Sequence, residues 1–165
     1  MRRTIMNRTI AAAGFALLAA TTLAGCGSDE EATRDADTNE VTEAGEADVF
    51  SLALGDCIDD DGLGNEVSDV AAVPCAEPHD NEVFHVVEME GDDWPGDEAV
   101  EAAVEEGCVG EFETFVGVAY MDSELDIFPL TPTQGSWEQG DDREILCLIY
   151  DPAGPVEGSL EGAAR

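Results

Sequence analysis

Alternation of apolar and polar positions predicts several β-strands, and the clearest one lies near the C-terminus. Residues 143–150, REILCLIY, are apolar on both faces when arranged as a strand. The alternate positions are Ile145, Cys147 and Ile149 on one face, and Leu146, Leu148 and Tyr150 on the other. A strand that is apolar on both faces is typical of the centre of a sheet, so we expect a helix to cover one side of it.

Four other stretches are predicted to be extended chain. They are residues 49–58, 70–75, 82–89 and 125–133. The third, EVFHVVEM, is rich in β-branched and aromatic residues and predicts a strand buried on both faces. The prolines of the last stretch indicate an edge strand or a strand end. Residues 134–142, QGSWEQGDD, are expected to form a hairpin-like connection, and the tail from residue 151 a loop or short edge strand.

Residues 97–117 carry the period of an amphipathic helix. Its apolar stripe consists of Val100, Val104, Cys108, Phe112 and Phe115. Gly107 and Gly110 each weaken a helix by up to about 1 kcal/mol, which predicts a kink or a two-part helix. Asp97 is placed to cap its N-terminus. Together the patterns predict an α+β fold, in which one main helix packs on a small antiparallel sheet.

The N-terminus predicts export and a lipid anchor. Three arginines in the first eight residues precede an apolar run, IAAAGFALLAATTLAG, shorter than the ~20 residues of a membrane-spanning helix. Residues 1–25 therefore predict a secretory signal. The run ends in LAGC, which resembles the lipobox of bacterial lipoproteins, whose cysteine is acylated by chains such as palmitate and becomes the mature N-terminus. This resemblance predicts lipid attachment at Cys26; the alternative is ordinary cleavage near Ala24.

The segment after the lipobox is expected to be a spacer. Residues 26–49 contain no aromatic residue and only two large aliphatic ones, Val41 and Val49. Such a composition predicts an acidic, disordered tether, because it offers too little apolar area to offset the entropy of ordering. The folded domain is then expected over residues 50–165.

The charge balance excludes some classes of partner. The chain has 39 acidic and 6 basic residues and a net charge of −33. Loss of the three arginines of the signal would leave 3 − 39 = −36. Nucleic acid and anionic lipid head groups are poor partners for such a surface. The acidity favours either a basic partner or adaptation to a salty habitat, and the even spread of carboxylates along the chain favours the second.

Four cysteines remain after Cys26, which is the pattern of disulfides in an exported domain. Cys108 lies on the apolar stripe of the helix and Cys147 in the central strand, so a bridge between them would pin helix to sheet. Cys57 and Cys75 would then close the acidic loop between them. Sequence alone leaves the other two pairings open.

Three motifs resemble the septum-formation domain of actinobacteria. They are GDC at 55–57, VPCAEPHDNEV at 73–83 and WEQGDDREILC at 137–147. The resemblance covers about residues 50–160 and implies an exported, membrane-tethered protein of envelope or division processes, without a known catalytic activity. This chain departs from the pattern at Asp142, which lengthens the spacing from the tryptophan to the arginine by one residue, and in its acidic first loop.

Both histidines lie in the same stretch as Cys75, which raises two chemical alternatives. A zinc site would need more ligands than Cys75, His79 and the distant His85. A catalytic cysteine–histidine pair would need a free thiolate. Neither is favoured; the resemblance and turn chemistry imply that His79 and Glu82 hold a turn. His79 also remains a candidate recognition residue at the surface.

Other side chains are candidates for binding. Trp94 and Trp137 are expected in loops, where they would contact a partner or a glycan, or cap the core. Arg143 is expected to pair with one of the carboxylates beside it. Asp59 and Asp61 occupy positions of an EF-hand loop that lacks the final bidentate glutamate, so only weak divalent-cation binding is expected there.

These observations predict a lipoprotein on the outer face of the cytoplasmic membrane, with a non-enzymatic binding or scaffold domain in septum formation or other envelope processes. Its partner would be an envelope or division protein. No serine-nucleophile motif is present and no carboxylate pair stands out, so we expect no enzyme and no cofactor. The alternative is a ligand-capturing lipoprotein that binds cations or a small basic solute through acidic loops.

Overall fold

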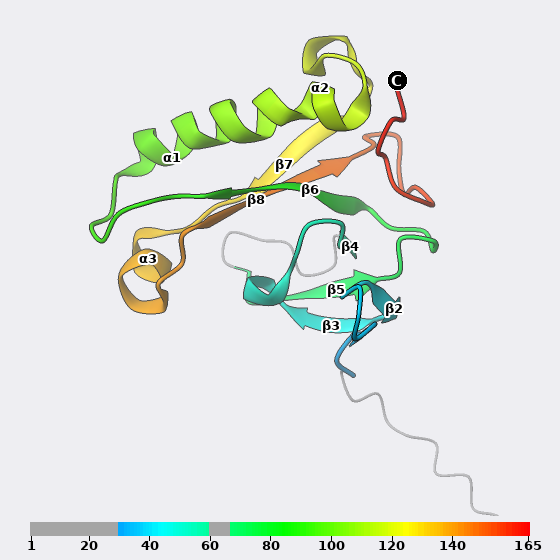
Figure 1. Cartoon of the computed structure of the whole chain (residues 1–165), viewed down its shortest axis with the longest axis horizontal. Helices are drawn as coiled ribbons and strands as arrows, with labels where there is room; N and C mark the ends of the chain where they lie inside the picture. The colour runs from blue at the N-terminus through cyan, green and yellow to red at the C-terminus, as the bar shows by residue number, and fades with distance from the viewer. Residues whose placement is uncertain (1–29, 60–66) are drawn as a thin grey trace, which may run out of the picture.

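A curled antiparallel sheet carries a long helical segment across one face (Figure 1). The computed structural model describes residues 30–59 and 67–165. The six strands of the sheet follow the order β3-β5-β4-β6-β8-β7, and β1 and β2 form a separate pair. The elements are β1 (Thr33–Arg34), β2 (Val41–Glu43), β3 (Gly45–Asp48), η1 (Val49–Ser51), β4 (Cys57–Ile58), β5 (Asp69–Val73), β6 (Asn81–Glu88), α1 (Asp97–Val104), η2 (Glu105–Val109), α2 (Gly110–Val116), η3 (Tyr120–Asp122), β7 (Asp126–Leu130), α3 (Gln134–Gly140) and β8 (Glu144–Tyr150). The predicted α+β class is confirmed.

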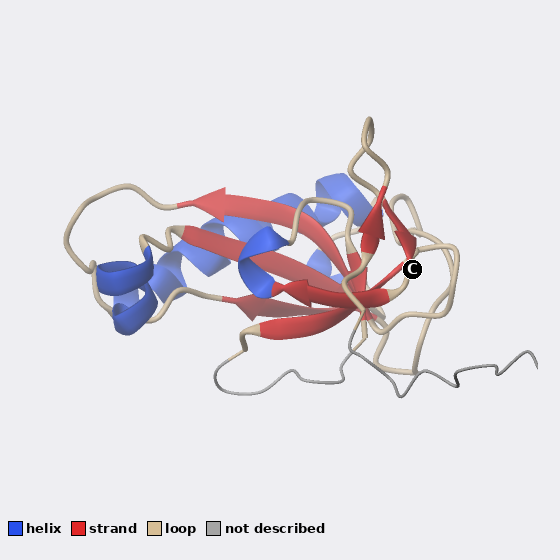
Figure 2. Ribbon diagram, turned by 90° about the horizontal axis from the view of Figure 1, so that it is seen from below, coloured by secondary structure: helices blue, strands red, loops and turns tan. Residues whose placement is uncertain are grey.

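Strand β8 lies between β6 and β7, and its two faces belong to different cores. Ile145, Cys147 and Ile149 pack with the helical segment, which covers one side of the strands (Figure 2). Leu146 and Leu148 pack on the other side with residues of β3, β4 and β5, where the sheet curls over itself. The predicted division of apolar positions between the two faces is confirmed.

The helical segment is continuous from α1 to α2 but widens to a π-type turn in η2. Gly107 lies in this turn, and a Cβ atom there would overlap Cγ2 of Val87 on β6. Gly110 has open space at the same position. The predicted irregularity is therefore confirmed, and Gly107 is the residue that lets the helix approach the sheet closely. The N-cap is Gly96, whose φ is 91°, and Asp97 is the first helical residue instead of the cap.

Both predicted disulfides are confirmed. Cys108 is bonded to Cys147, which ties the π-type turn to β8. Cys57 is bonded to Cys75, which ties β4 to the turn after β5. Each bridge joins segments far apart in the sequence, so each restricts the unfolded chain.

The predicted disordered tether is wrong for its described part, residues 30–49. Strand β3 pairs with β5 along its whole length, and β1 and β2 pair with each other. Val41, Ala47 and Val49 are buried in the core inside the curl of the sheet. Small apolar side chains suffice here because the sheet supplies hydrogen-bonding partners that composition does not reveal. The folded domain thus begins well before residue 50, whereas Cys26 lies outside the described residues.

Two local predictions are also corrected. Most of residues 49–58 form η1 and a turn, because the Asp48 side chain accepts the N–H of Phe50 and starts a helical turn. Residues 134–140 form α3 instead of a hairpin-like connection. Thr133 and Ser136 cap this helix reciprocally, each side chain accepting the backbone N–H of the other at 3.0 and 2.9 Å.

The C-terminal segment packs back on β6. Val156 forms an antiparallel bridge with His79, so the expected edge strand is reduced to a single bridge. The Glu82 carboxylate accepts the Ser159 hydroxyl at 2.6 Å and the Leu160 N–H at 2.7 Å. Glu82 therefore anchors the C-terminal segment. Across the described ranges, no helix combines the length and apolar character that crossing a bilayer requires.

Candidate binding groove

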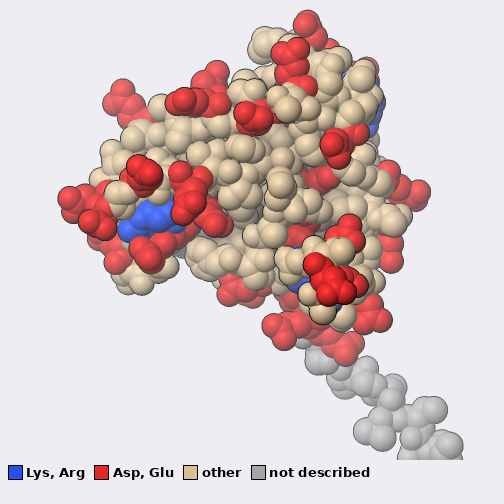
Figure 3. All heavy atoms as spheres, in the orientation of Figure 1, with Lys and Arg blue, Asp and Glu red and all other residues tan. Residues whose placement is uncertain are grey.

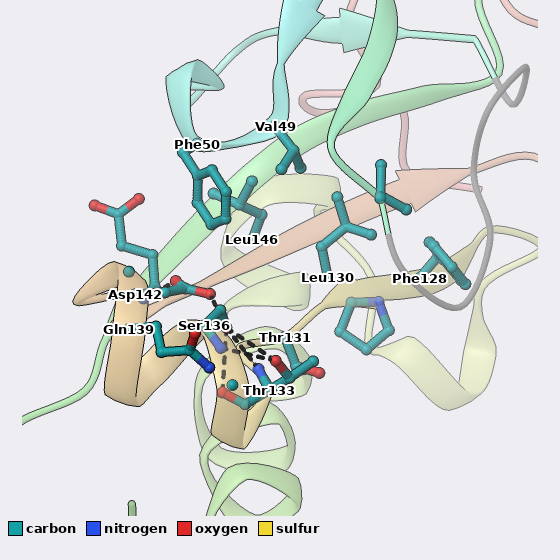
Figure 4. Close-up of a pocket in the computed structure, with 15 residues that line it drawn as sticks. Val49, Phe50, Phe128, Leu130, Thr131, Thr133, Ser136, Gln139, Asp142 and Leu146 are labelled. Carbon is teal, nitrogen blue, oxygen red and sulfur yellow. Dashed lines mark hydrogen bonds between the residues drawn. The ribbon is translucent and has the colours of Figure 1, made fainter. Parts of the chain in front are cut away.

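An open groove of about 620 Å³ lies where η1, β7, β8 and α3 meet (Figure 4). One wall is apolar and comes from η1, β7 and β8. The other is polar and comes from α3 and the residues just before β8. The volume lies within the range of about 300–1,000 Å³ that is typical of binding sites.

The apolar wall exposes large side chains to solvent. Phe50 is 63% exposed and Phe128 is 39% exposed, while Val49 and Leu146 are buried at the base. Figure 4 shows Phe50 and Leu146 on one side of the groove, with Leu130 and Phe128 following β7. Clustered exposed apolar side chains mark an interaction site more often than single ones do.

In the polar wall, the serine hydroxyl that could act as a nucleophile is already engaged in hydrogen bonds. The Ser136 hydroxyl donates to the Asp142 carboxylate at 2.8 Å and also caps α3 through Thr133. The lining residues include no histidine that could act as a base for this serine. The arrangement of this wall therefore fits binding better than nucleophilic catalysis.

The groove has an acidic end. Asp142 and Glu144 line it, and Glu88 lies directly opposite Glu144 in the β6–β8 pair. No ion pair among the described residues engages any of these three carboxylates. Figure 3 shows groups of acidic atoms around most of the visible face, with basic atoms confined to small areas. Like charges placed opposite each other are unfavourable until a cation approaches them.

A second, smaller hollow of about 360 Å³ lies beside α1. Trp94 and Pro129 line it together with Asp97 and Glu101, which are one helical turn apart. An aromatic ring beside two carboxylates is the arrangement that holds small organic cations. The prediction that Trp94 takes part in recognition stays a prediction.

Trp137 and Arg143 have structural roles. Trp137 is 1% exposed, so burial contradicts its predicted role at the surface. The Arg143 guanidinium lies 3.9 Å from the centroid of the Trp137 ring. It is also 3.1 Å from the Asp141 carboxylate, so the expected pairing with a neighbouring carboxylate is confirmed. Asp141 adopts a left-handed conformation at the end of α3, with a φ of 56°, and leads the chain through Asp142 to Arg143. Arg143 as a recognition residue stays a prediction.

His79 is fully buried, which contradicts its candidate role as a surface recognition residue. Its Nδ1 lies 2.9 Å from the Glu77 carbonyl, and its backbone pairs with Val156. Among the described residues, Nε2 has no hydrogen-bond partner. His79 therefore holds the turn, as the alternative reading of the sequence implied.

The metal-binding candidates receive no support from the described part of the chain. There, no group of three histidine, cysteine or acidic side chains is arranged to hold a metal ion. Asp59 is described, at the end of β4, whereas Asp61 lies outside the described residues. Weak cation binding at these two residues stays a prediction.

Sequence reasoning missed the ion pair between Arg34 and Asp56. Both guanidinium nitrogens of Arg34 donate to the Asp56 carboxylate at 2.7 Å, and this pair raises the pKa of Arg34. Asp56 is 4% exposed and also accepts the Ala53 N–H at 2.8 Å. The only sequence signal was the aspartate of the GDC motif, which needs a cationic partner if it is buried.

A second missed cluster joins η3 to the edge strand β7. The Tyr120 hydroxyl donates to the Asp126 carboxylate. This hydrogen bond is the main cause that raises the pKa of Tyr120 to about 12 and lowers the pKa of Asp126. The cluster fixes the start of β7, whose other end borders the groove.

The comparisons with known proteins agree with the sequence motifs. Comparison with curated proteins and with solved structures found no match. A family model described as septum formation matches residues 23–159, which include the groove and the whole segment that sequence reasoning assigned to a tether. The chain therefore belongs to the septum-formation family.

Proposed function

We propose that this chain is a lipid-anchored lipoprotein on the outer face of the cytoplasmic membrane, whose domain binds a partner without catalysis during septum formation. The family supports a role in septum formation. The LAGC motif supports acylation of Cys26, and two disulfides are typical of an exported domain. A lipid at Cys26 would hold the domain close to envelope proteins.

The groove is the observation that carries the binding function. Phe50 and Phe128 expose apolar surface beside buried aliphatic residues, on a protein whose net charge is −33. Exposing such surface favours aggregation unless a partner covers it. The engaged hydroxyl of Ser136 supports binding over hydrolysis.

The test is microscopy of a functional fluorescent fusion in dividing cells of the native host. Wild type is expected to be enriched at the septum, and Cys26→Ala is expected to lose both the membrane signal and the enrichment. Mass spectrometry of the N-terminal peptide would show whether Cys26 carries acyl chains. A uniform peripheral signal of a lipidated wild type would refute the role in septation while leaving the anchor in place.

The second hollow supports a second candidate function, capture of a small basic solute. Trp94 with Asp97 and Glu101 offers an aromatic face and two carboxylates to an organic cation. Calorimetry with spermidine and with calcium chloride tests it. Stoichiometric sub-micromolar binding of spermidine that Trp94→Ala abolishes would support capture; only weak binding that Trp94→Ala leaves unchanged would refute it.

A further inference from the structure

We infer that the groove receives an extended segment of a partner protein that combines apolar side chains with lysine or arginine. This inference rests on the proposed binding function and names the chemical class of its partner. It follows from four properties of the groove: its apolar anchors, its acidic end, the charge of the whole domain and the blocked edge of β7.

The apolar anchors set the first requirement. Phe50 and Phe128 stand at the rim, Leu130 lines the same apolar wall, and Leu146 is buried at the base. Large apolar side chains of a ligand would cover these residues and displace water from their surface. Because the groove is open to solvent, a chain segment can lie in it.

The acidic end sets the second requirement. Asp142, Glu144 and Glu88 gather there, and every described arginine has its ion pair elsewhere. A lysine or arginine of the ligand would relieve the repulsion between the paired glutamates. The charge at this end therefore complements a cationic residue next to the apolar ones.

Overall charge excludes two other occupants of an apolar groove. A second copy would bring another strongly acidic surface with a net charge of −33 against the first. An anionic membrane surface would be repelled for the same reason. A basic segment is instead attracted over a distance of about 8 Å at physiological salt.

The outer edge of β7 offers no free N–H, so strand addition there is disfavoured and side chains carry the recognition. Pro129 has no N–H. The N–H of Ile127, two residues earlier and thus on the same side of the strand, donates to the Asp126 carboxylate at 2.8 Å. Removing donors from an edge is a known protection against pairing with another strand. Specificity therefore lies in the apolar and cationic side chains of the ligand.

The test is fluorescence anisotropy with the full chain purified from membranes in a neutral detergent. The probe is a short fluorescent peptide in which leucine alternates with lysine. One comparison peptide has glutamate in place of lysine, and another has serine in place of leucine. Only the first is expected to bind, and its affinity is expected to fall as salt is raised.

Variants locate the binding in the groove. The double variant Phe50→Ser with Phe128→Ser is expected to weaken binding at least about fivefold, the lower limit for an interface position that matters. Met121→Ser is the matched control, because Met121 is 88% exposed and lies outside the groove. Glu144→Gln is expected to weaken binding and to reduce its salt dependence, whereas Glu157→Gln, at an exposed site in the C-terminal segment, is not.

Four results would overturn the inference. They are equal binding of the three peptides, equal binding by the double variant and wild type, a dimer in sedimentation that the double variant abolishes, and absence of any peptide binding. Septal enrichment without peptide binding would refute this partner class alone, and peptide binding without septal enrichment would refute the role in septation alone.

Discussion

Replacement of Arg34 by methionine tests whether residues 30–48 belong to the folded domain. Arg34 is bonded through both nitrogens to Asp56, which is almost fully buried. Methionine keeps much of the apolar stem but leaves the Asp56 carboxylate without its cation. The Ala53 N–H still satisfies one carboxylate oxygen.

The expected loss follows from the burial of the pair. Removing one partner of a buried ion pair costs about 3–5 kcal/mol. The Arg34 side chain is partly exposed and Asp56 keeps one hydrogen bond, so we expect a loss of about 2–3 kcal/mol. Arg165→Met is the matched control, because Arg165 pairs with Asp151 near the surface, where such pairs contribute about 1 kcal/mol or less.

The assay is urea denaturation of the disulfide-bonded chain, followed by tryptophan fluorescence. Urea is preferred to guanidinium because it is uncharged and does not screen the ion pair. The double variant Arg34→Met with Asp56→Asn should lose less than the sum of the single variants. Hydrogen exchange in Arg34→Met should rise at Ala32, whose N–H donates to the Glu46 carbonyl, and at Glu46, whose N–H donates to the Glu30 carbonyl. A loss under about 0.5 kcal/mol with unchanged exchange would refute the reasoning.

Three further predictions concern the helix, the disulfides and the tyrosine cluster. Gly107→Ala should destabilise the fold by about 1–3 kcal/mol because its Cβ would overlap β6, whereas Gly110→Ala should stabilise it by up to about 1 kcal/mol; equal effects in urea denaturation would contradict this. Loss of the Cys108–Cys147 bridge, which spans 39 residues, should lower the free energy of unfolding by about 4 kcal/mol. Loss of the Cys57–Cys75 bridge, which spans 18, should lower it by about 3 kcal/mol. Urea denaturation of the two double-alanine variants, with the remaining bridge verified by peptide mapping, would measure both losses. In an absorbance titration Tyr120 should ionise at about pH 12, later than an ordinary tyrosine, and Tyr120→Phe should remove that step. Because the folded pKa of Asp126 is lowered, its stabilising effect is present above its unfolded pKa of ~3.9 and is lost as pH falls through the folded value; Tyr120→Phe should shrink that loss in acid denaturation.

Sequence reasoning succeeded where structure follows a local period. The alternation in β8 placed Ile145 and Leu146 in different cores, and the helical stripe placed Cys108 opposite Cys147. In both cases the residues that decide the structure lie in one short segment. Period and spacing alone then determine which face is buried.

Sequence reasoning failed where structure depends on distant residues. Residues 30–48 are ordered by pairing with β5 and by one ion pair to Asp56, and neither changes the composition of the segment. The groove combines Phe50, Phe128 and Asp142, which are remote in sequence and have no common motif. Helix α3 depends on a cap in which Ser136 replaces the usual acidic residue. The ordered N-terminal strands and the groove would require knowledge of the tertiary contacts, whereas the cap of α3 is local and was missed because Ser136 departs from the usual pattern.

The three described arginines explain how so acidic a chain stays folded and what it can bind. Arg34 binds Asp56 and holds the N-terminal strands to the sheet. Arg143 stacks on the buried Trp137 ring of α3, and Arg165 binds Asp151 and holds the C-terminus to the end of β8. Each cation therefore joins segments that are separated in the sequence. Since none is left to neutralise the groove, the acidic end of the groove can select a cationic partner, and salt should weaken that partnership more than it weakens the fold.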